Sequence, residues 1–197
     1  YTALHTFCGN ELSAFYFDIR KDSLYCDGIG DARRRAARTV LDSVFERLVT
    51  WLAPVLAFTA EEAWLSRYPS DDDSVHLRTF PETPTAWRDD ALAERWQRLR
   101  AIRRVVTGAL EVERREKRIG SSLQAHPVVH VSAADAALLA DVDLAELAIT
   151  SQITVTSDAP PADAFTMAEE PGIAVAVGAA EGDKCERCWR QLHEVSP

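Results

Sequence analysis

The sequence predicts a mostly α-helical fold, in which an antiparallel helical bundle precedes a small α/β unit and a cysteine-containing knuckle. Apolar residues recur at three- and four-residue steps through most of residues 1–120, as on the buried face of a helix. Short runs of β-branched residues replace this pattern in residues 121–180, and two cysteines lie close together in residues 181–197. We therefore expect three domains with these boundaries.

Length and composition exclude several classes of protein. With 197 residues, the chain can form one large domain or two small ones with real cores. It has no secretory signal, no apolar run of about 18 residues and only four cysteines, so we expect a cytoplasmic protein without disulfides or a membrane partner. The net charge of −9 argues against non-specific binding to nucleic acid by the whole surface.

The basic residues are nevertheless concentrated in one segment. Residues 95–118 contain nine Lys or Arg and three Glu, which leaves 13 basic and 28 acidic residues elsewhere. An acidic protein with one basic helix can still bind a phosphate backbone locally. The alternative is a solvated helix face with intrahelical ion pairs, and the charge count alone favours this alternative.

Four helices are predicted in the first domain. The first covers residues 1 to about 20, and the second starts near Asp31, whose side chain can cap it. Pro54 interrupts the second helix because it lacks the backbone donor. A third helix runs from there through residues 58–64, with an alternative start at Thr59, which has capping-box spacing.

The fourth helix is the longest and runs from about residue 89 to residue 118. At about 1.5 Å per residue it extends roughly 45 Å. At about 100° per residue, four arginines fall on one flank of its apolar stripe. They are Arg100, Arg104, Arg115 and Arg118.

The composition changes after Gly120, which ends the long helix. Alternating short strands and helices then predict the small α/β unit. Its expected elements are strands at residues 128–131, 153–156 and 173–177, a helix at 133–140, one or two helical turns at 144–149, and a loop at 158–171.

Cys185 and Cys188 resemble one half of a zinc knuckle, with Arg187 and Trp189 beside them. A structural zinc takes four ligands in a tetrahedron, and a second Cys-x-x-Cys is missing from the sequence. His193 is a candidate third ligand, although a lone histidine in a tail is more often solvated. Two free cysteines are the alternative, and a thioredoxin-like redox pair fits less well because no βαβ pattern surrounds the motif.

Four stretches of the sequence form one further pattern: ELSAFYFDIRKDSLY (11–25), LAPVLAFTAEEAW (52–64), ERREKRIGSSLQA (113–125) and KCERCW (184–189). Together they resemble the C-terminal part of isoleucyl-tRNA synthetases; they occur in the family's order and cover this chain from end to end. The Ala-Pro, Phe-Thr, Glu-Glu and Trp pattern of the second stretch is shared with the valine and leucine synthetases, whereas the first and third are more particular to the isoleucine family.

The resemblance implies the role of each region. The bundle is expected to be an anticodon-binding domain of the class I synthetase type, the α/β unit a junction domain, and the knuckle the start of a zinc-binding tail. The family's catalytic and editing domains, which use ATP and Mg²⁺ to join isoleucine to its tRNA, have no counterpart here, so we expect no catalytic residue. The mid-helix start at Tyr1 and the single Met167 also indicate a fragment of a longer protein.

The resemblance also implies the site residues. Arg187 and Trp189 are expected to contact the anticodon, since an indole offers a stacking face and a guanidinium offers donors. Cys185 and Cys188 are expected to bind zinc in the full-length protein. Further candidates for contact with the tRNA backbone are Arg100, Arg104, Arg118, Arg20 and Lys21.

The expected partners are a tRNA for isoleucine and the catalytic domain of the same parent chain, and we expect no DNA partner. Two alternatives stay open. The first is the anticodon-binding region of the related valine or leucine enzyme, although residues 15–22 argue against it. The second is a non-catalytic helical scaffold with a zinc or redox tail and no RNA partner.

Overall fold

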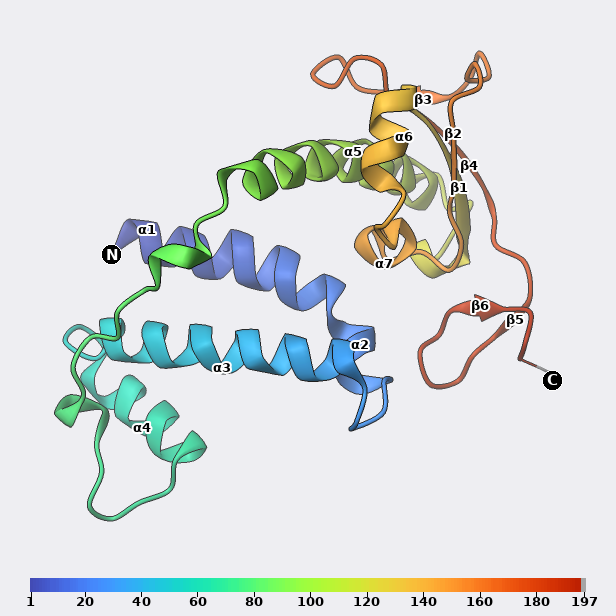
Figure 1. The fold of residues 1–197 in the computed structure, drawn as a ribbon. Helices are drawn as coiled ribbons and strands as arrows, with labels where there is room; N and C mark the ends of the chain where they lie inside the picture. The colour runs from blue at the N-terminus through green and yellow to red at the C-terminus, as the bar shows by residue number, and fades with distance from the viewer. Residues whose placement is uncertain (196–197) are drawn as a thin grey trace. The chain divides into compact units, whose positions relative to one another are not determined.

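The structure is a computed structural model that describes residues 1–195 (Figure 1). Most of the chain is helical, as predicted, and a mixed four-stranded sheet and a two-stranded hairpin follow the helices. Contacts within the chain define two compact units, residues 1–88 and the remainder from Asp89. Within residues 1–195, no helix combines the length and the apolar character that crossing a membrane requires.

The first unit consists of helices and their connections. A π-helical segment, η1, continues α1, so the predicted first helix is confirmed although its hydrogen-bond type was not expected. We find no feature of the sequence that accounts for the π-helical type. The elements are α1 (Thr2–Thr6), η1 (Phe7–Phe17), α2 (Lys21–Tyr25), α3 (Ala32–Leu52), α4 (Ala57–Arg67), η2 (Val75–Leu77) and η3 (Thr85–Trp87).

The predicted ends of α3 are confirmed. Asp31 caps its start, because the carboxylate accepts the backbone N–H groups of Arg33 at 2.7 Å and Arg34 at 3.4 Å. The helix ends two residues before Pro54. The alternative start of the next helix at Thr59 is wrong, since α4 begins at Ala57 without a side-chain cap.

α4 folds back on α3, and the two helices share a small core (Figure 1). Trp64 is its largest buried side chain, and the indole N–H donates to the Asp73 carboxylate at 3.2 Å. This contact ties the loop after α4 to the core. The buried members of the cluster are Val49, Ala53, Ala60, Trp64 and Val75.

The second unit begins with α5 (Asp90–Arg115), which Asp89 caps by accepting the N–H of Leu92 at 2.9 Å. The helix ends three residues earlier than predicted. Lys117 takes a left-handed backbone conformation with φ of 59°, and the N–H of Arg118 turns back to the carbonyl of Glu113 at 2.9 Å. This turn closes the C-terminus of α5 and leads the chain toward the sheet.

All three predicted strands and both predicted helical segments of the α/β unit are present. The elements after α5 are η4 (Ser122–Gln124), β1 (Ala125–His130), α6 (Ala133–Leu139), α7 (Leu144–Ala148), β2 (Thr154–Thr156), β3 (Phe165–Thr166), β4 (Ala174–Ala179), β5 (Asp183–Lys184) and β6 (Gln191–Leu192). The short strand β3 lies in the segment predicted as loop.

The main sheet is mixed and has the strand order β2-β1-β4-β3. β1 pairs with β2 in parallel, which the crossover through α6 and α7 makes possible. β4 pairs in antiparallel fashion with β1 on one side and with β3 on the other. β1 and β4 therefore form the centre of the sheet.

α5 packs on this sheet. Its stripe is fully buried at Leu99, Ile102, Val105 and Val106. At Gly108 the approach is so close that an added Cβ would lie 3.1 Å from the Phe165 ring of β3. The compact units therefore do not follow the boundary expected near residue 120, because the apolar stripe of α5 is covered by the sheet. The division into functional domains at 1–120, 121–180 and 181–197 remains a prediction.

Candidate nucleic-acid interface

The two cysteines lie in the turn of the β5–β6 hairpin, which follows the main sheet (Figure 1). The N–H of Cys185 donates to the carbonyl of Arg190 at 2.8 Å, and the N–H of Trp189 donates to the carbonyl of Cys185 at 2.8 Å. Trp189 has a left-handed backbone with φ of 66°, which is uncommon for a residue with a Cβ. The turn therefore holds a specific conformation that the Cys-x-x-Cys spacing alone did not reveal.

Gly182 is required where the chain enters the hairpin. Its φ of +99° suits glycine, and a Cβ at this position would lie 2.5 Å from the carbonyl carbon of Leu192. The two strands approach each other too closely here for any other residue without a backbone shift.

The turn favours the thiolate form of Cys185. The backbone N–H groups of Cys188 and Arg187 donate to its sulfur, and the Cys188 side chain adds a hydrogen bond, so the pKa of the Cys185 thiol is lowered. Both cysteines are half-buried and neither forms a disulfide. A lowered thiol pKa and backbone donors to sulfur suit a soft metal ligand, so the pair fits two positions of a zinc site.

Residues 1–195 contain no grouping of three or more His, Cys, Asp or Glu side chains arranged to hold a metal. His193, the candidate third ligand, is exposed and its Nε2 lies 3.8 Å from the carboxylate of Glu181. Its role as a ligand remains a prediction.

The turn of the hairpin presents an aromatic ring next to a cation. Trp189 is 63% exposed, and the Lys184 ammonium lies 5.3 Å from the centroid of its ring. Arg187 is also exposed. An indole has two faces, so a cation over one face leaves the other for a flat partner such as a nucleobase. Lys184 is thus a further candidate for contact with RNA, and the sequence motif alone did not distinguish it.

The arginines predicted on one flank of the long helix differ in their exposure and in their ion pairs. Arg104 is exposed and pairs with Glu170 at 3.0 Å. Arg118 pairs with Glu113 at 2.6 Å and also with Glu116, and these carboxylates raise its pKa. Arg100 is half-buried. A phosphate that binds Arg104 or Arg118 must therefore share the guanidinium with a carboxylate that is already present or replace it.

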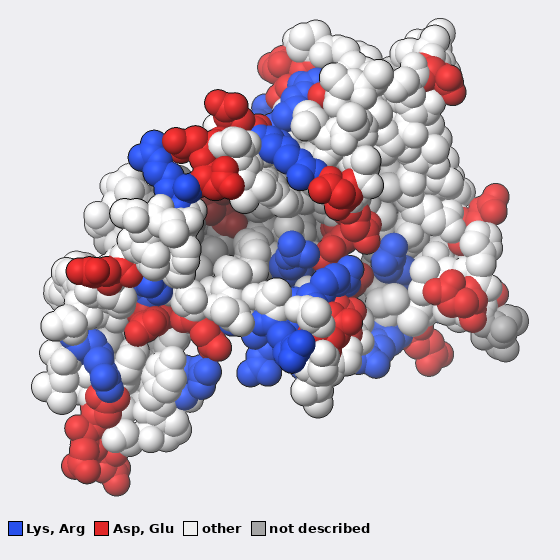
Figure 2. All heavy atoms as spheres, viewed as in Figure 1, with Lys and Arg blue, Asp and Glu red and all other residues white. Residues whose placement is uncertain are grey.

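Ion pairs also engage other cations of this segment. Arg95 pairs with Asp141, Arg98 with Asp135, and Arg114 with Glu111. On the face shown in Figure 2, Lys and Arg alternate with Asp and Glu and do not form one continuous basic area. Much of residues 95–118 is therefore a charged helix face with ion pairs, which is the alternative that the charge count favoured.

Arg20 and Lys21 belong to the first unit, at the start of α2. Lys21 is exposed and pairs with Asp18 at 2.6 Å. Arg20 is half-buried and interacts with Tyr16, whose pKa is raised chiefly by burial and lowered in part by Arg20. Both remain candidates for contact with RNA.

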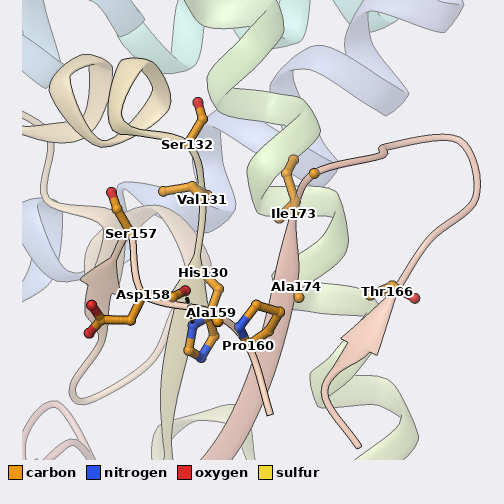
Figure 3. A pocket seen from close by; sticks show the side chains of 11 residues that line it. His130, Val131, Ser132, Ser157, Asp158, Ala159, Pro160, Thr166, Ile173 and Ala174 are labelled. Atoms are coloured by element: carbon orange, nitrogen blue, oxygen red, sulfur yellow. Dashed lines mark hydrogen bonds between the residues drawn. The ribbon is translucent and has the colours of Figure 1, made fainter. Parts of the chain in front are cut away.

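A concavity of about 440 Å³ in the second unit lies at the ends of β1 and β4 (Figure 3). His130 Nδ1 contacts the backbone carbonyl of Asp158 at 3.1 Å, while the Asp158 carboxylate points away from the ring. Ser132 caps α6 and donates to Asp135. These groups do not form a nucleophile and base pair, so the concavity does not resemble a catalytic site.

A family model described as the anticodon-binding domain of tRNA ligase matches residues 1–129. An isoleucine–tRNA ligase from Agrobacterium fabrum is 58% identical over 194 residues, and one from Ruegeria pomeroyi is 57% identical over 196 residues. One from Bartonella henselae is 52% identical over 194 residues. These alignments cover 98%, 99% and 98% of this chain but 20% of each relative.

The chain belongs to the family of anticodon-binding domains of tRNA ligases. Within that family it corresponds to the anticodon-binding region of isoleucine–tRNA ligase, and it spans about a fifth of the length of the curated relatives it matches. The resemblance predicted from the sequence is confirmed, and the valine or leucine alternative is not favoured.

The ion pair between Arg98 of α5 and Asp135 of α6 shows what the paired arginines do for the fold. Asp135 is 7% exposed and accepts from Arg98 Nε and Nη2 at 2.7 Å each and from Ser132 Oγ at 3.0 Å. The hydrogen bonds from Arg98 lower the pKa of the Asp135 carboxyl, against an opposite effect of burial. Arg98 is therefore assigned to stability and not to ligand binding.

We expect Asp135→Asn to lower the free energy of unfolding at pH 7 by on the order of 2 kcal/mol, because it removes the nearer of the two carboxylates that pair with Arg98, the other being Glu170 at 3.7 Å. Because the pKa of Asp135 is lower in the folded than in the unfolded state, its ionised carboxylate stabilises the fold above the unfolded pKa of about 3.9. This stabilisation is lost as the pH falls through the pKa of the folded state. Urea unfolding at pH 7 and near pH 3 should therefore show a smaller difference between variant and parent in acid. Asp163→Asn, at an exposed site, is the control, and an equal loss at both pH values would refute an ionic origin.

Proposed function

We propose that this chain recognises the anticodon loop of an isoleucine tRNA, as part of an enzyme that uses ATP and Mg²⁺ to join isoleucine to that tRNA in the cytoplasm. Family membership over residues 1–129 and the identity of 52–58% to isoleucine–tRNA ligases support the proposal. The catalytic and editing activities belong to other parts of the parent protein. The catalytic domain is then a partner of this region within one chain.

The observation that carries the proposal is the exposed Trp189 on a hairpin with a defined turn. Anticodon loops present unstacked bases that proteins read by stacking and by hydrogen bonds to base edges. Trp189 supplies the stacking face, and Arg187 supplies donors for a base edge or a phosphate. Lys184 adds a positive charge beside the ring.

The remaining predicted contacts serve the phosphate backbone. Arg100 and Arg104 lie on α5 and Arg118 in the turn after it, while Arg20 and Lys21 precede α3. Backbone contacts add affinity without reading sequence, and they make binding sensitive to salt. Because Arg104 and Arg118 start from carboxylate pairs, each contributes less than an unpaired cation would.

We expect Trp189→Ala to weaken binding of the chain to an isoleucine anticodon stem-loop by about 1–3 kcal/mol, or roughly five- to 150-fold, because one stacked base is lost. The measurement is a low-salt titration with this stem-loop and with a variant changed at one anticodon base. Arg187→Ala should reduce the preference between the two RNAs. Trp87→Ala, which removes an exposed tryptophan of the first unit, is the matched control.

A second pair of variants separates recognition from general attraction. Charge reversal at Arg100 and Arg104 should weaken binding to both RNAs equally and reduce the salt dependence. If Trp189→Ala leaves both affinities unchanged, the hairpin does not contact the anticodon. If the parent binds neither RNA, the proposal fails for this chain.

We also propose that Cys185 and Cys188 are two of the four ligands of a structural zinc, and that residues outside this Cys-x-x-Cys motif provide the other two. The half-buried thiols and the backbone donors to Cys185 support this assignment. A bound zinc would cross-link the turn and supply no chemistry to the reaction.

With two thiolate ligands, the chain should bind zinc weakly and lose it to a chelator. Cobalt substitution provides the measurement, since thiolate-to-metal absorption should vanish in Cys185→Ser and Cys188→Ser and persist in Cys8→Ser and Cys26→Ser. Stoichiometric, chelator-resistant zinc in the monomer would show a different ligand set. His193→Ala would then identify the first candidate.

A further inference from the structure

We propose that Ser151 and Gln152 are positioning residues that hold the β5–β6 hairpin in one place on the second unit, so that Trp189 meets its partner in a fixed geometry. The RNA consequence rests on the proposed function, whereas the docking of the hairpin rests on protein contacts alone. We call residues 151–152 the hairpin clamp. Neither residue belongs to the knuckle motif, and both lie more than thirty residues before it in the sequence.

Ser151 connects the hairpin to the start of the sheet. Its side chain is buried, and the hydroxyl donates to the carbonyl of Leu123 at 2.6 Å. The same oxygen accepts the N–H of Gln191, in β6, at 2.7 Å. One hydroxyl thus acts as donor and acceptor between two distant segments, and alanine cannot replace either bond.

The backbone of Ser151 makes a further bond to the hairpin. Its carbonyl accepts Nη2 of Arg190 at 2.9 Å, and Arg190 is the residue next to Trp189. The carbonyl of Arg190 in turn accepts the N–H of Cys185. Arg190 is therefore assigned to the orientation of the turn, and its guanidinium is directed to the protein.

Gln152 holds Glu181, just before the hairpin, by two hydrogen bonds to its backbone, as a neighbouring strand would. Its side-chain amide donates to the carbonyl of Glu181 at 3.0 Å and accepts the N–H of Glu181 at 3.2 Å. Glu181 directly precedes Gly182, where the chain turns with no room for a Cβ. The clamp thus fixes the hairpin at its entry through Gln152 and at its returning strand through Ser151.

The clamp itself is held by the core of the second unit. Thr150 is buried, and its N–H donates to the carbonyl of Ala145 in α7 at 3.0 Å. Ile149 adopts a left-handed backbone with φ of 57°, which ends α7 and directs the chain into the clamp. Since α7 packs on α5, the clamp is positioned by buried apolar contacts and not by the hairpin.

A hairpin of this size needs such support. β5 and β6 contain two residues each, and an isolated two-stranded hairpin is marginal in water even when it is longer. Four hydrogen bonds from the clamp supply the order that the short ladder lacks. The location of Trp189 on the unit is then set without a metal, and zinc would act only on the internal geometry of the turn.

Hydrogen exchange of the 197-residue chain tests the docking directly. In Ser151→Ala, the amide of Gln191 should exchange about tenfold faster or more, because its acceptor is gone. In Gln152→Ala, the amide of Glu181 should likewise exchange faster than in the parent chain. Amides of the central strands β1 and β4 should not change. Ser157→Ala and Gln97→Ala, both at exposed sites, are the matched controls.

A double-mutant cycle distinguishes positioning from general stability. Ser151→Ala should weaken binding to the isoleucine anticodon stem-loop about tenfold and reduce its preference over the one-base variant. In the Trp189→Ala background the same substitution should have no further effect, because Ser151 acts through the hairpin. Ser151→Thr, which keeps the hydroxyl, should restore the slow exchange of Gln191.

The outcomes separate the two proposals. Unchanged exchange at Glu181 and Gln191 in both variants would overturn the clamp. Faster exchange together with unchanged RNA affinity and preference would overturn its positioning role, and so would additive effects in the cycle. A parent chain that binds neither RNA, with the expected exchange changes, would reject the proposed function while the docking of the hairpin by the clamp is upheld.

Discussion

The burial of the α5 stripe against the sheet is the interaction on which the second unit depends. Leu99, Ile102, Val105 and Val106 are fully buried, and each such side chain contributes about 1.5–3 kcal/mol when it leaves water. Because α6 and α7 also pack along α5, this single helix fixes the sheet, the crossover and the loop that follows α7. The hairpin that carries Trp189 is attached to that loop, so the geometry of the proposed interface is inherited from the core.

The charge of the protein is consistent with local RNA binding. A chain with a net charge of −9 gains little from long-range attraction, and the ion pairs of α5 reduce the positive charge available to phosphates. Recognition then depends more on stacking and on directed hydrogen bonds than on general electrostatics. The hairpin supplies such groups, with Lys184 beside the exposed indole of Trp189 and with Arg187 exposed in the same turn.

Most helices and strands could be predicted from the sequence because their signals are local. Asp31 caps α3 and Pro54 follows its end, as the spacing of residues indicated. The short strand β3 could not be predicted, since two residues give no periodicity and Phe165 is placed by its contact with α5 at Gly108. The partner of α5 was also missed, because an apolar stripe shows that a face is buried and does not show what covers it. At the site, the cysteine motif and Trp189 were visible, whereas Ser151 offers no local signal at all.

The most direct test of anticodon recognition by the hairpin is photochemical cross-linking with an isoleucine anticodon stem-loop that carries 4-thiouridine at a loop position. We expect the cross-linked peptide to contain residues 184–189, and the yield to fall in Trp189→Ala and with unlabelled competitor RNA. Cross-links confined to α5 or to the first unit, with none in the hairpin, would contradict the assignment of Trp189 and Arg187 as anticodon contacts.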